Sequence, residues 1–422
     1  MTAEVVVTGD AAGTVYAPGE VAWSGDRLVY VGPPRGRTGG RRIAVGDGAI
    51  LPGLVNTHNH AAMALLRGYA DDARLMAWLR DHIWPVEARM TAEDVYVGTL
   101  LACLEMIRGG TVAFADMYLH ADAVARAADA AGLRAFVARG LVGDGPEAEA
   151  ALARAVEEAR GFAARYPLVE GWLGPHAPYT CSPALLERVA DQARLHGLGI
   201  HIHLSESVEE IREVRARYGL SPIALAQRTG ILGERTLVAH GVHLDAEDIR
   251  LLAESRATVA HCPVSNLKLG NGTAPVLDLL AAGVNVALGS DGPASTNTLD
   301  LFLEMRVAAW LQKTLRGDPA AFGARQALAL ATRGGARGLG YAGGVLEPGA
   351  PADLVAVRWS RPHTTPHTDP LSTVVYATQA SDVRYTVVAG RLLLDDGRVT
   401  VVDEDAVLAE ARERAGRLTG RP

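Results

Sequence analysis

The sequence contains few lysine, cysteine and aromatic residues. Lysine stands at only two of the 422 positions, Lys268 and Lys313, so arginine supplies almost all the positive charge. The three cysteines lie far apart without a Cys-x-x-Cys pair, which argues against a disulfide framework and against a thiolate zinc site. Aromatic residues make up 5% of the chain, a proportion that favours close packing of small residues over large aromatic clusters.

Other absences restrict the class of protein. The formal net charge is -7 and no run of basic residues occurs, so we expect no nucleic-acid partner. No apolar run approaches the length of a membrane span, and the opening residues MTAEVVVTGD lack the pattern of a signal peptide. We therefore expect no membrane association and a cytoplasmic location. The hydrophobic fraction of 49% is ample for a large buried core.

Both ends of the chain consist of short β-rich segments separated by turns. The predicted strands are residues 5–8, 20–23, 28–31, 353–357, 383–388 and 391–394. Their common texture predicts that residues 1–53 and 346–422 pair into one small split β-sandwich domain. A surface helix is predicted at residues 404–417, within the second part of this domain.

Between these ends, residues 54–345 alternate short apolar runs with helical segments. The apolar runs are residues 54–56, 112–114, 135–138, 171–174, 199–204, 237–239, 258–260 and 284–288, and the clearest helices are residues 93–108, 146–166 and 183–196. Eight strands separated by helices predict an α/β fold of the (β/α)8 TIM-barrel type. A doubly wound sheet is the alternative, but the glycine-rich phosphate loop that it predicts after the first strand is missing.

Two histidines lie where the first predicted barrel strand runs into its loop, the end at which barrel enzymes build their active sites. His58 and His60, in LVNTHNH, share one face of the strand because side chains alternate. Two imidazoles on one face can chelate a metal ion. They could equally be satisfied polar residues at a strand end.

The fifth predicted strand carries a second such pair, His201 and His203. His203 lies nearer the carboxyl end of the strand and is the better candidate ligand, whereas His201 is expected to be a buried structural histidine. Glu206 follows in the loop, where it could meet a bound substrate. It could also be an acid at the start of a helix.

His240 and Asp291 end two later apolar strands. His240 could be a ligand, a general base or a core residue. Asp291 precedes Gly-Pro and could belong to a turn, but a buried carboxylate requires a partner or a cation. Taken together, three imidazoles and a carboxylate at the strand ends suit Zn²⁺, with Fe²⁺ or Mn²⁺ also possible.

These residues lie within longer strings that resemble a known family. The strings are LPGLVNTHNH (51–60), EMIRGGTVAFADMY (105–118), GPHAPYTCS (174–182), HLSES (203–207), AHGVHL (239–244), HCPVSNLKLGNGTAPV (261–276) and GSDGPASTNTLDLFLEMR (289–306). With them the chain resembles the amidohydrolase superfamily, and within it the methylthioadenosine/S-adenosylhomocysteine deaminases, relatives of the triazine chlorohydrolases. The resemblance covers nearly the whole chain.

The resemblance implies a role for each site residue. Metal ligands would be His58, His60, His203 and Asp291; proton carriers would be Glu206, His240 and Asp291; substrate contacts would be Trp84, Glu87, Arg139, His176 and Glu206. A single metal is implied, because residues 171–176 hold no lysine to bridge two ions. Dimers and tetramers are common in the family, so a homo-oligomer is expected.

The activity implied by the resemblance is the hydrolytic deamination of an adenine nucleoside to its inosine analogue. Family members that take S-adenosylhomocysteine carry a second arginine in the loop that is here residues 140–146, which has no basic residue. A neutral 5′ group is therefore favoured, as in methylthioadenosine, 5′-deoxyadenosine or adenosine. One alternative is hydrolysis of another amino- or chloro-substituted heterocycle, such as an s-triazine, guanine or a pterin. A second is a non-catalytic binding barrel, against which the full metal set argues.

Overall fold

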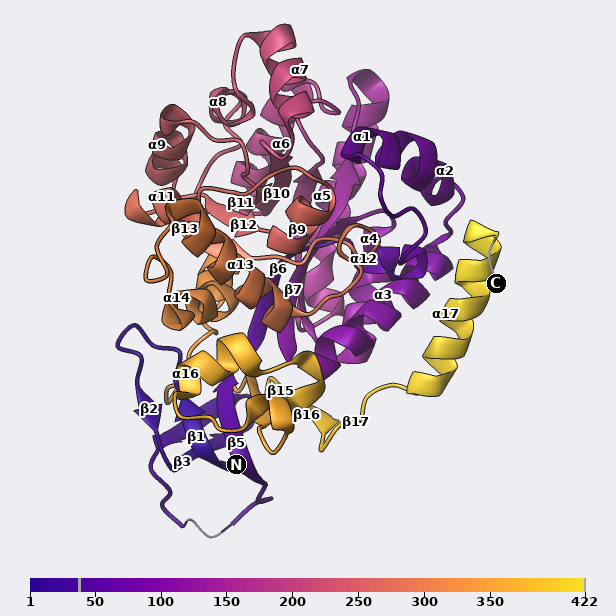
Figure 1. Ribbon diagram of the computed structural model, residues 1–422. Coiled ribbons are helices and arrows are strands. Elements are labelled where there is room, and N and C mark those ends of the chain that lie inside the picture. Colours follow the sequence, from indigo (N-terminus) through magenta and orange to yellow (C-terminus); the bar gives the residue numbers. More distant parts are fainter. Residues whose placement is uncertain (37–38, 421–422) are drawn as a thin grey trace.

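The computed structural model describes residues 1–36 and 39–420 and places a barrel above a second sheet (Figure 1). Eight parallel strands form the barrel, each hydrogen-bonded to its neighbour in the sequence. They are β6 (Leu54–Asn59), β7 (Thr111–Tyr118), β8 (Arg134–Leu141), β9 (Val169–Pro175), β10 (Gly199–Leu204), β11 (Thr236–His240), β12 (Thr258–His261) and β13 (Asn285–Leu288). Every predicted barrel strand is present, so the predicted fold class is confirmed.

The first and last barrel strands meet through side chains. The Thr57 hydroxyl donates to the carbonyl oxygen of Leu288 at 2.8 Å, and the Asn56 amide donates to the Ser290 hydroxyl at 2.7 Å. One residue further along, the backbone N–H of Asp291 donates to the carbonyl oxygen of His58 at 3.0 Å. Closure of the barrel therefore places Asp291 beside the first histidine pair, although more than two hundred residues separate them.

Helices surround the barrel strands. They are α3 (Ala92–Arg108), α4 (Ala121–Ala131), α5 (Gly145–Arg165), α6 (Pro183–His196), α7 (Val208–Tyr218), α8 (Pro222–Arg228), α9 (Ala246–Ser255), α10 (Pro263–Lys268), α11 (Val276–Ala281), α12 (Pro293–Thr296), α13 (Leu301–Arg316), α14 (Ala324–Ala329), η3 (Leu330–Gly334) and α15 (Gly335–Leu339). Short polar side chains fix where several of them begin. Ser182, Ser207 and Asp245 each accept a backbone N–H of the first turn, which satisfies a donor that the helix itself leaves unpaired.

A run of short helices connects β6 to α3. They are η1 (Ala61–Leu66), α1 (Leu75–Ala77), η2 (Trp78–Ile83) and α2 (Trp84–Glu87). Because β6 ends at the carboxyl edge of the barrel, this segment lies over the barrel opening. It brings Trp84 and Glu87 to that opening.

Strands from both chain ends join in one nine-stranded mixed sheet. They are β1 (Thr2–Val7), β2 (Val15–Tyr16), β3 (Gly19–Ser24), β4 (Arg27–Gly32), β5 (Ala44–Pro52), β14 (Leu354–Arg358), β15 (Val383–Val388), β16 (Arg391–Asp395) and β17 (Arg398–Val399), with η4 (Pro362–Thr364), α16 (Pro370–Ser372), η5 (Thr373–Ala377) and η6 (Ala380–Asp382) between β14 and β15. The pairing of β5 with β14 joins the two halves of the predicted split domain. A β-sandwich was expected, but these strands form one continuous sheet. Strand β5 was not predicted, because Gly46 and Gly48 interrupt its β pattern.

Alternate residues of this sheet face different cores. Val5 and Val7 of β1 pack with the core of the barrel, whereas Val6 belongs to a second core on the other face of the sheet. An ion pair reinforces the junction, since Arg134 at the start of β8 donates to Asp353 at 2.6 and 3.2 Å. The sheet is thus a base packed against the barrel.

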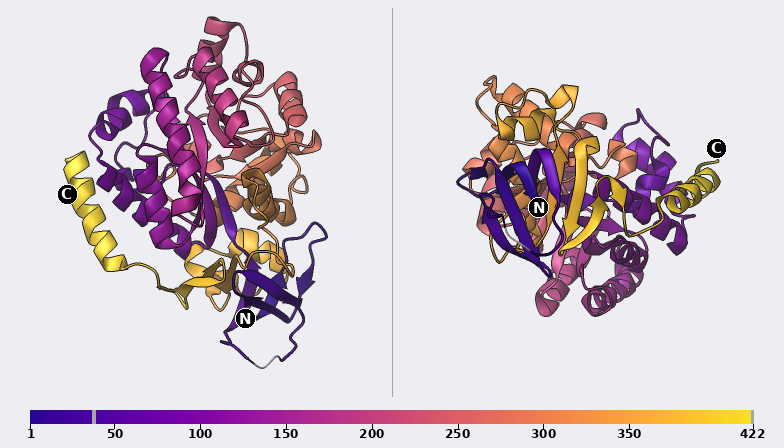
Figure 2. Two further views of the ribbon diagram at one scale, coloured as in Figure 1. Left: turned by 180° about the vertical axis from the view of Figure 1, so that it is seen from behind. Right: turned by 90° about the horizontal axis from the view of Figure 1, so that it is seen from below.

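The last helix, α17 (Glu404–Thr419), packs mainly against α3 and η1 beside the barrel (Figure 2). The buried carboxylate of Asp94 on α3 holds it there, because Arg414 donates to this group at 2.9 Å and Arg417 donates to it as well. The helix was predicted within the split β-domain, but this charge pairing attaches it to the barrel. Across residues 1–36 and 39–420, no helix combines the length and apolarity needed to cross a membrane.

Candidate active site

A cavity of about 620 Å³ opens at the carboxyl ends of the barrel strands. Its polar lining gathers most of the predicted site residues: His60, Trp84, Glu87, His176, His203, Glu206, His240 and Asp291. His58 is completely buried behind this lining. Its ring contacts those of His60 and His203, which line the cavity. Residues far apart in the sequence thus converge because their strands end at one barrel mouth.

Imidazole nitrogens and one carboxylate oxygen crowd together at the floor of the cavity. The Nε2 atoms of His60 and His203 lie 3.2 Å apart. Oδ1 of Asp291 lies 3.3 Å from Nε2 of His58 and 3.4 Å from Nε2 of His60. The geometry groups His58, His60 and His203 as one set of possible metal ligands, and His58, His240 and Asp291 as a second set that shares His58.

The protonation states of these groups fit a zinc ion. Nδ1 of His60 lies 2.6 Å from the carbonyl oxygen of Met117, and Nδ1 of His203 lies 2.8 Å from that of His176. A carbonyl can only accept, so these Nδ1 atoms carry the hydrogens and each Nε2 offers its lone pair. Nε2 of His58 is buried and lies 3.3 Å from Oδ1 of Asp291, a separation at which one metal ion could bind both atoms.

The Asp291 carboxylate is prepared to stay charged. Burial alone would raise its pKa, but hydrogen bonding to His58 and the neighbouring imidazoles hold that pKa well below the usual range. Its Oδ2 accepts the hydroxyls of Ser265 and Ser295 at 2.6 and 2.7 Å. Burial lowers the pKa of His58 to about 3, so this imidazole is neutral at pH 7. Neutral imidazoles with one carboxylate are the usual nitrogen and oxygen ligands of zinc.

Glu206 and His240 form a second pair beside the metal-ligand candidates. Nε2 of His240 lies 3.6 Å from Oε2 of Glu206, and both side chains are buried. The amide of Asn271 donates to the other carboxyl oxygen of Glu206 at 2.9 Å. Burial, and to a lesser degree the charge of Asp291, raises the pKa of Glu206 to about 8, although the bond from Asn271 lowers it. Glu206 is therefore protonated at neutral pH and can act as an acid.

Backbone geometry aims this pair into the cavity. His240 and Ser205 have φ angles of 72° and 57°, in the left-handed region that non-glycine residues rarely adopt. The carboxylate of buried Glu210 accepts the backbone N–H groups of Ser205 and Glu206 at 2.9 and 2.7 Å. Glu210 thus fixes the turn that carries Glu206.

Sequence reasoning missed the partners Glu210, Asn266 and Asn271. Asn266 accepts from Nδ1 of His240 at 3.0 Å, because the Asn266 oxygen can only accept. Both asparagines lie in the string HCPVSNLKLGNG, directly after β12. An asparagine after a barrel strand was the available signal, since such positions face the same opening as the catalytic candidates.

Apolar side chains make up much of the cavity lining. They are Met63, Leu75, Trp78, Leu79, Trp84, Met117, Leu119, Val142 and Leu269. Glu87 lies among them, where burial raises its pKa to about 7 and a hydrogen bond with Tyr118 lowers it. His176 also lines the cavity, next to His203, with its Nδ1 2.8 Å from the Thr180 hydroxyl. Of the described residues, neither lysine nor arginine lines the cavity.

Arg139 does not join the other candidates. Its guanidinium donates to both carboxyl oxygens of Glu158 on α5, at 2.6 and 2.7 Å, and Arg139 is not part of the cavity lining. The side chain leaves β8 toward the outer helix, where an acid neutralises it. In this structure Arg139 links β8 to α5, and its substrate contact stays a prediction.

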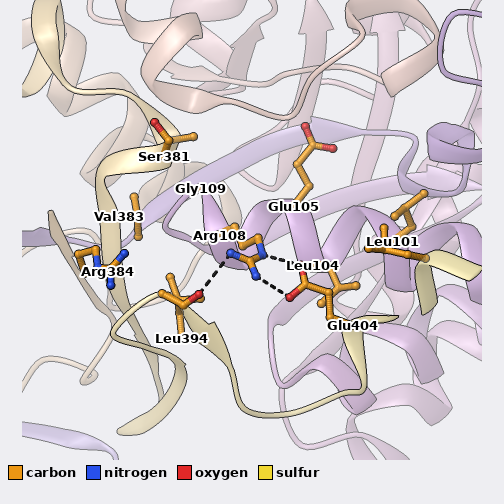
Figure 3. A pocket seen from close by; sticks show the side chains of 13 residues that line it. Leu101, Leu104, Glu105, Arg108, Gly109, Ser381, Val383, Arg384, Leu394 and Glu404 are labelled. Carbon is orange, nitrogen blue, oxygen red and sulfur yellow. Dashed lines mark hydrogen bonds and ion pairs between the residues drawn. The ribbon is translucent and has the colours of Figure 1, made fainter. Parts of the chain in front are cut away.

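A second cavity, of about 420 Å³, lies where α3, β15, β16 and α17 meet (Figure 3). Arg108 crosses it and donates to Glu404 through Nε at 2.7 Å. It contains none of the predicted site residues. The predicted site residues thus gather at the barrel mouth and not in this second cavity.

Comparison with known proteins agrees with this geometry. The amidohydrolase family matches residues 49–393. A 5-methylthioadenosine/S-adenosylhomocysteine deaminase of Pelotomaculum thermopropionicum is 44% identical over 99% of this chain and 98% of its own length, and a 5′-deoxyadenosine deaminase of Methanosarcina mazei is 47% identical over 88% and 87%. The crystal structure of an adenosine deaminase from Xanthomonas campestris with bound zinc superposes with a TM-score of 0.94, at 38% identity, over 99% of this chain and 98% of that one. The chain belongs to the amidohydrolase family.

Proposed function

We propose that this protein is a zinc-dependent hydrolase that deaminates an adenine nucleoside, releasing ammonia and the inosine analogue. The observation that carries the proposal is the mixed lining of one cavity. It combines a protonated acid, imidazoles and a carboxylate that suit a cation with a further carboxyl group, Glu87, and many apolar side chains. The deaminase names of the relatives support the same chemistry.

The metal would be held by His58, His60, His203 and Asp291. A bound zinc ion supplies Lewis acidity, which lowers the pKa of a water molecule toward neutrality. The alternatives Fe²⁺ and Mn²⁺ use similar nitrogen and oxygen ligands, so the choice of zinc rests on the donor set and on the zinc-bound structural relative.

Glu206 would donate a proton to a ring nitrogen of the purine. Asn271 occupies its Oε1, so the proton belongs on Oε2, which faces His240 and the cavity. Protonation of the ring withdraws electrons from C6 and makes this carbon easier for water to attack. Because its pKa is raised, Glu206 is protonated at neutral pH and can donate this proton.

His240 and Asp291 would accept the proton of the attacking water. Nδ1 of His240 donates to Asn266, so its Nε2 presents a lone pair to the cavity. Asp291 keeps one oxygen, Oδ1, toward the same region while the serines hold the other. Transfer of this one proton to the amino group would let ammonia leave, and the remaining proton of the C6 hydroxyl would pass to Glu206 as the carbonyl forms.

Glu87, Trp84 and His176 would hold the rest of the nucleoside. A carboxylate can accept two hydroxyl donors at once, which fits the paired hydroxyls of a ribose. The 5′ substituent, being farthest from C6, would reach the apolar opening formed by Trp84, Leu119 and Val142, whose side chains are 36%, 36% and 57% exposed. A neutral 5′ group, as in methylthioadenosine, 5′-deoxyadenosine or adenosine, fits this wall better than the charged end of S-adenosylhomocysteine.

A substrate panel tests the proposal. Purified protein is supplied with zinc and offered adenosine, 5′-deoxyadenosine, methylthioadenosine, free adenine, guanine and an s-triazine, and ammonia release is measured with the ultraviolet change from adenine to hypoxanthine. We expect turnover of the nucleosides at least about a hundredfold above that of the free bases, because the ribose contacts position the ring. Equal or faster release from guanine or a triazine would refute the nucleoside assignment. A homo-oligomer in the cytoplasm is part of the same proposal, and sedimentation of the pure protein tests its assembly.

A further inference from the structure

The three candidate imidazole ligands are anchored by different kinds of partner. His60 and His203 use backbone carbonyl oxygens, of Met117 and His176. Those oxygens cannot donate, so the orientation and tautomer of both rings follow from the fold alone. His58 has no such carbonyl, and its anchoring atom belongs to another histidine.

Nδ1 of His58 lies 2.7 Å from Nε2 of His201, and the two rings meet edge to face with an interplanar angle of 80°. Both side chains are completely buried. His201 forms no ion pair within the described part of the chain, and its own Nδ1 has no hydrogen-bond partner there. Two neutral imidazoles at this distance share a single hydrogen, so their tautomers are coupled.

Only one of the two coupled states suits a metal ion. When Nδ1 of His58 carries the hydrogen and Nε2 of His201 accepts it, Nε2 of His58 offers a lone pair beside Asp291. In the opposite state, Nε2 of His201 donates, Nδ1 of His58 accepts, and Nε2 of His58 carries a hydrogen that blocks coordination. An acceptor at the position of His201 Nε2 is therefore what makes His58 a ligand.

We infer that His201 is a positioning residue that sets the tautomer of His58 and thereby the affinity of the site for zinc. This inference rests on the proposed function only in taking His58 as a ligand. The inference goes beyond that function because it gives a role to His201, which does not line the cavity and whose Nε2 faces His58.

A matched pair of amide variants separates this role from simple packing. The side-chain oxygen of His201→Gln can take the place of Nε2, whereas the shorter side chain of His201→Asn places its amide near the position of Nδ1. The dissociation constant of zinc is measured for each full-length variant by competition with a chromophoric chelator. We expect His201→Gln to stay within about threefold of the natural protein and His201→Asn to bind zinc about 10–100-fold more weakly.

The control is His261→Asn, which also replaces a completely buried barrel histidine, one whose ring nitrogens have no partner among the described residues. Zinc affinity should not change in this variant, and thermal melting of all variants reports their folding. Equal zinc affinities for His201→Gln and His201→Asn, whether both strong or both weak, would overturn the inference. Absence of zinc binding by the natural protein would instead overturn the proposed function, so the two failures are distinguishable.

Discussion

Oε2 of Glu206 lies 3.6 Å from Nε2 of His240, and the two side chains are 6% and 1% exposed. This pairing joins a residue in the loop after β10 to the last residue of β11. It places a protonated carboxyl next to an imidazole whose free nitrogen is an acceptor. The two residues can therefore move protons in opposite directions within one turnover.

Replacing Glu206 tests the acid role. Glu206→Gln keeps the size and the bond to Asn271 but removes the transferable proton, so we expect kcat to fall at least about a hundredfold. Zinc content, measured by atomic emission, should stay at the level of the natural protein because Glu206 is not among the ligand candidates. The control is Asp405→Asn, which makes a similar acid-to-amide change at an exposed position of α17 and should leave kcat unchanged. A kcat within threefold of normal in Glu206→Gln would remove Glu206 from the mechanism.

The Glu87 carboxyl predicts a pH dependence of substrate binding. Burial raises its pKa to about 7, with the Tyr118 bond opposing that rise. The charged form, which accepts ribose hydroxyls, therefore dominates above pH 7 and is lost as the pH falls below it. Between pH 8 and 6 we expect KM for an adenine nucleoside to rise by up to about tenfold.

A 2′,3′-dideoxy substrate provides the comparison, because it lacks the hydroxyls that Glu87 would bind. In the ratio of KM for the dideoxy substrate to KM for the ordinary nucleoside, the effects of the other titrating groups of the site cancel. In Glu87→Gln this ratio should no longer change with pH. A ratio that still follows a pKa near 7 in that variant would exclude Glu87 as its source.

The apolar opening predicts discrimination at the 5′ position. Among the described residues neither lysine nor arginine lines the cavity, whereas three acids do. We expect kcat/KM for S-adenosylhomocysteine to lie at least about tenfold below that for methylthioadenosine, because its carboxylate would be desolvated without a partner. Val142→Arg should reduce the ratio of kcat/KM for methylthioadenosine to that for S-adenosylhomocysteine by about fivefold, because an exposed ion pair with the substrate carboxylate contributes about that much.

The matched control for this change is Leu195→Arg, which adds the same charge at a position 71% exposed on α6, outside the cavity. The substrate ratio should not move in Leu195→Arg. Equal kcat/KM values for the two substrates in the natural protein would contradict the idea that the opening selects neutral groups.

Asp94 predicts a stability effect far from the chemistry. Burial would raise the pKa of Asp94, but bonds from Arg417, Thr91 and Arg414 outweigh burial and lower it. Asp94→Asn should reduce the free energy of unfolding by about 2 kcal/mol, since Arg417 loses its carboxylate partner, Arg414 keeps Glu410 but loses Asp94, and a helix cap weakens. Because the folded-state pKa is depressed, this contribution is present at neutral pH and is lost as the pH falls below about 4. Denaturant unfolding at pH 7 measures the change, and a loss below 0.5 kcal/mol would show that Asp94 does not secure α17.

The sequence predicted the parts of the molecule that repeat a pattern. The barrel strands alternate with amphipathic helices, so their number and order were readable, and the strand-end positions of His58, His203 and Asp291 indicated a common opening. Partners supplied across space were not readable. The bond of Asn271 to Glu206 and that of His201 to His58 depend on how loops and strands meet. Arg139 was expected in the site from the family resemblance, whereas its ion pair with Glu158 depends on the direction of one side chain.

The most direct test of the whole account is the dependence of deamination on the metal. Ammonia release from 5′-deoxyadenosine is measured before removal of metal with a chelator, after removal, and after addition of zinc in steps. The account predicts loss of activity on removal and full recovery at one zinc ion per chain, with no recovery in His60→Ala. Activity that survives complete removal of metal, or a zinc-saturated protein that releases no ammonia from any adenine nucleoside, would contradict it.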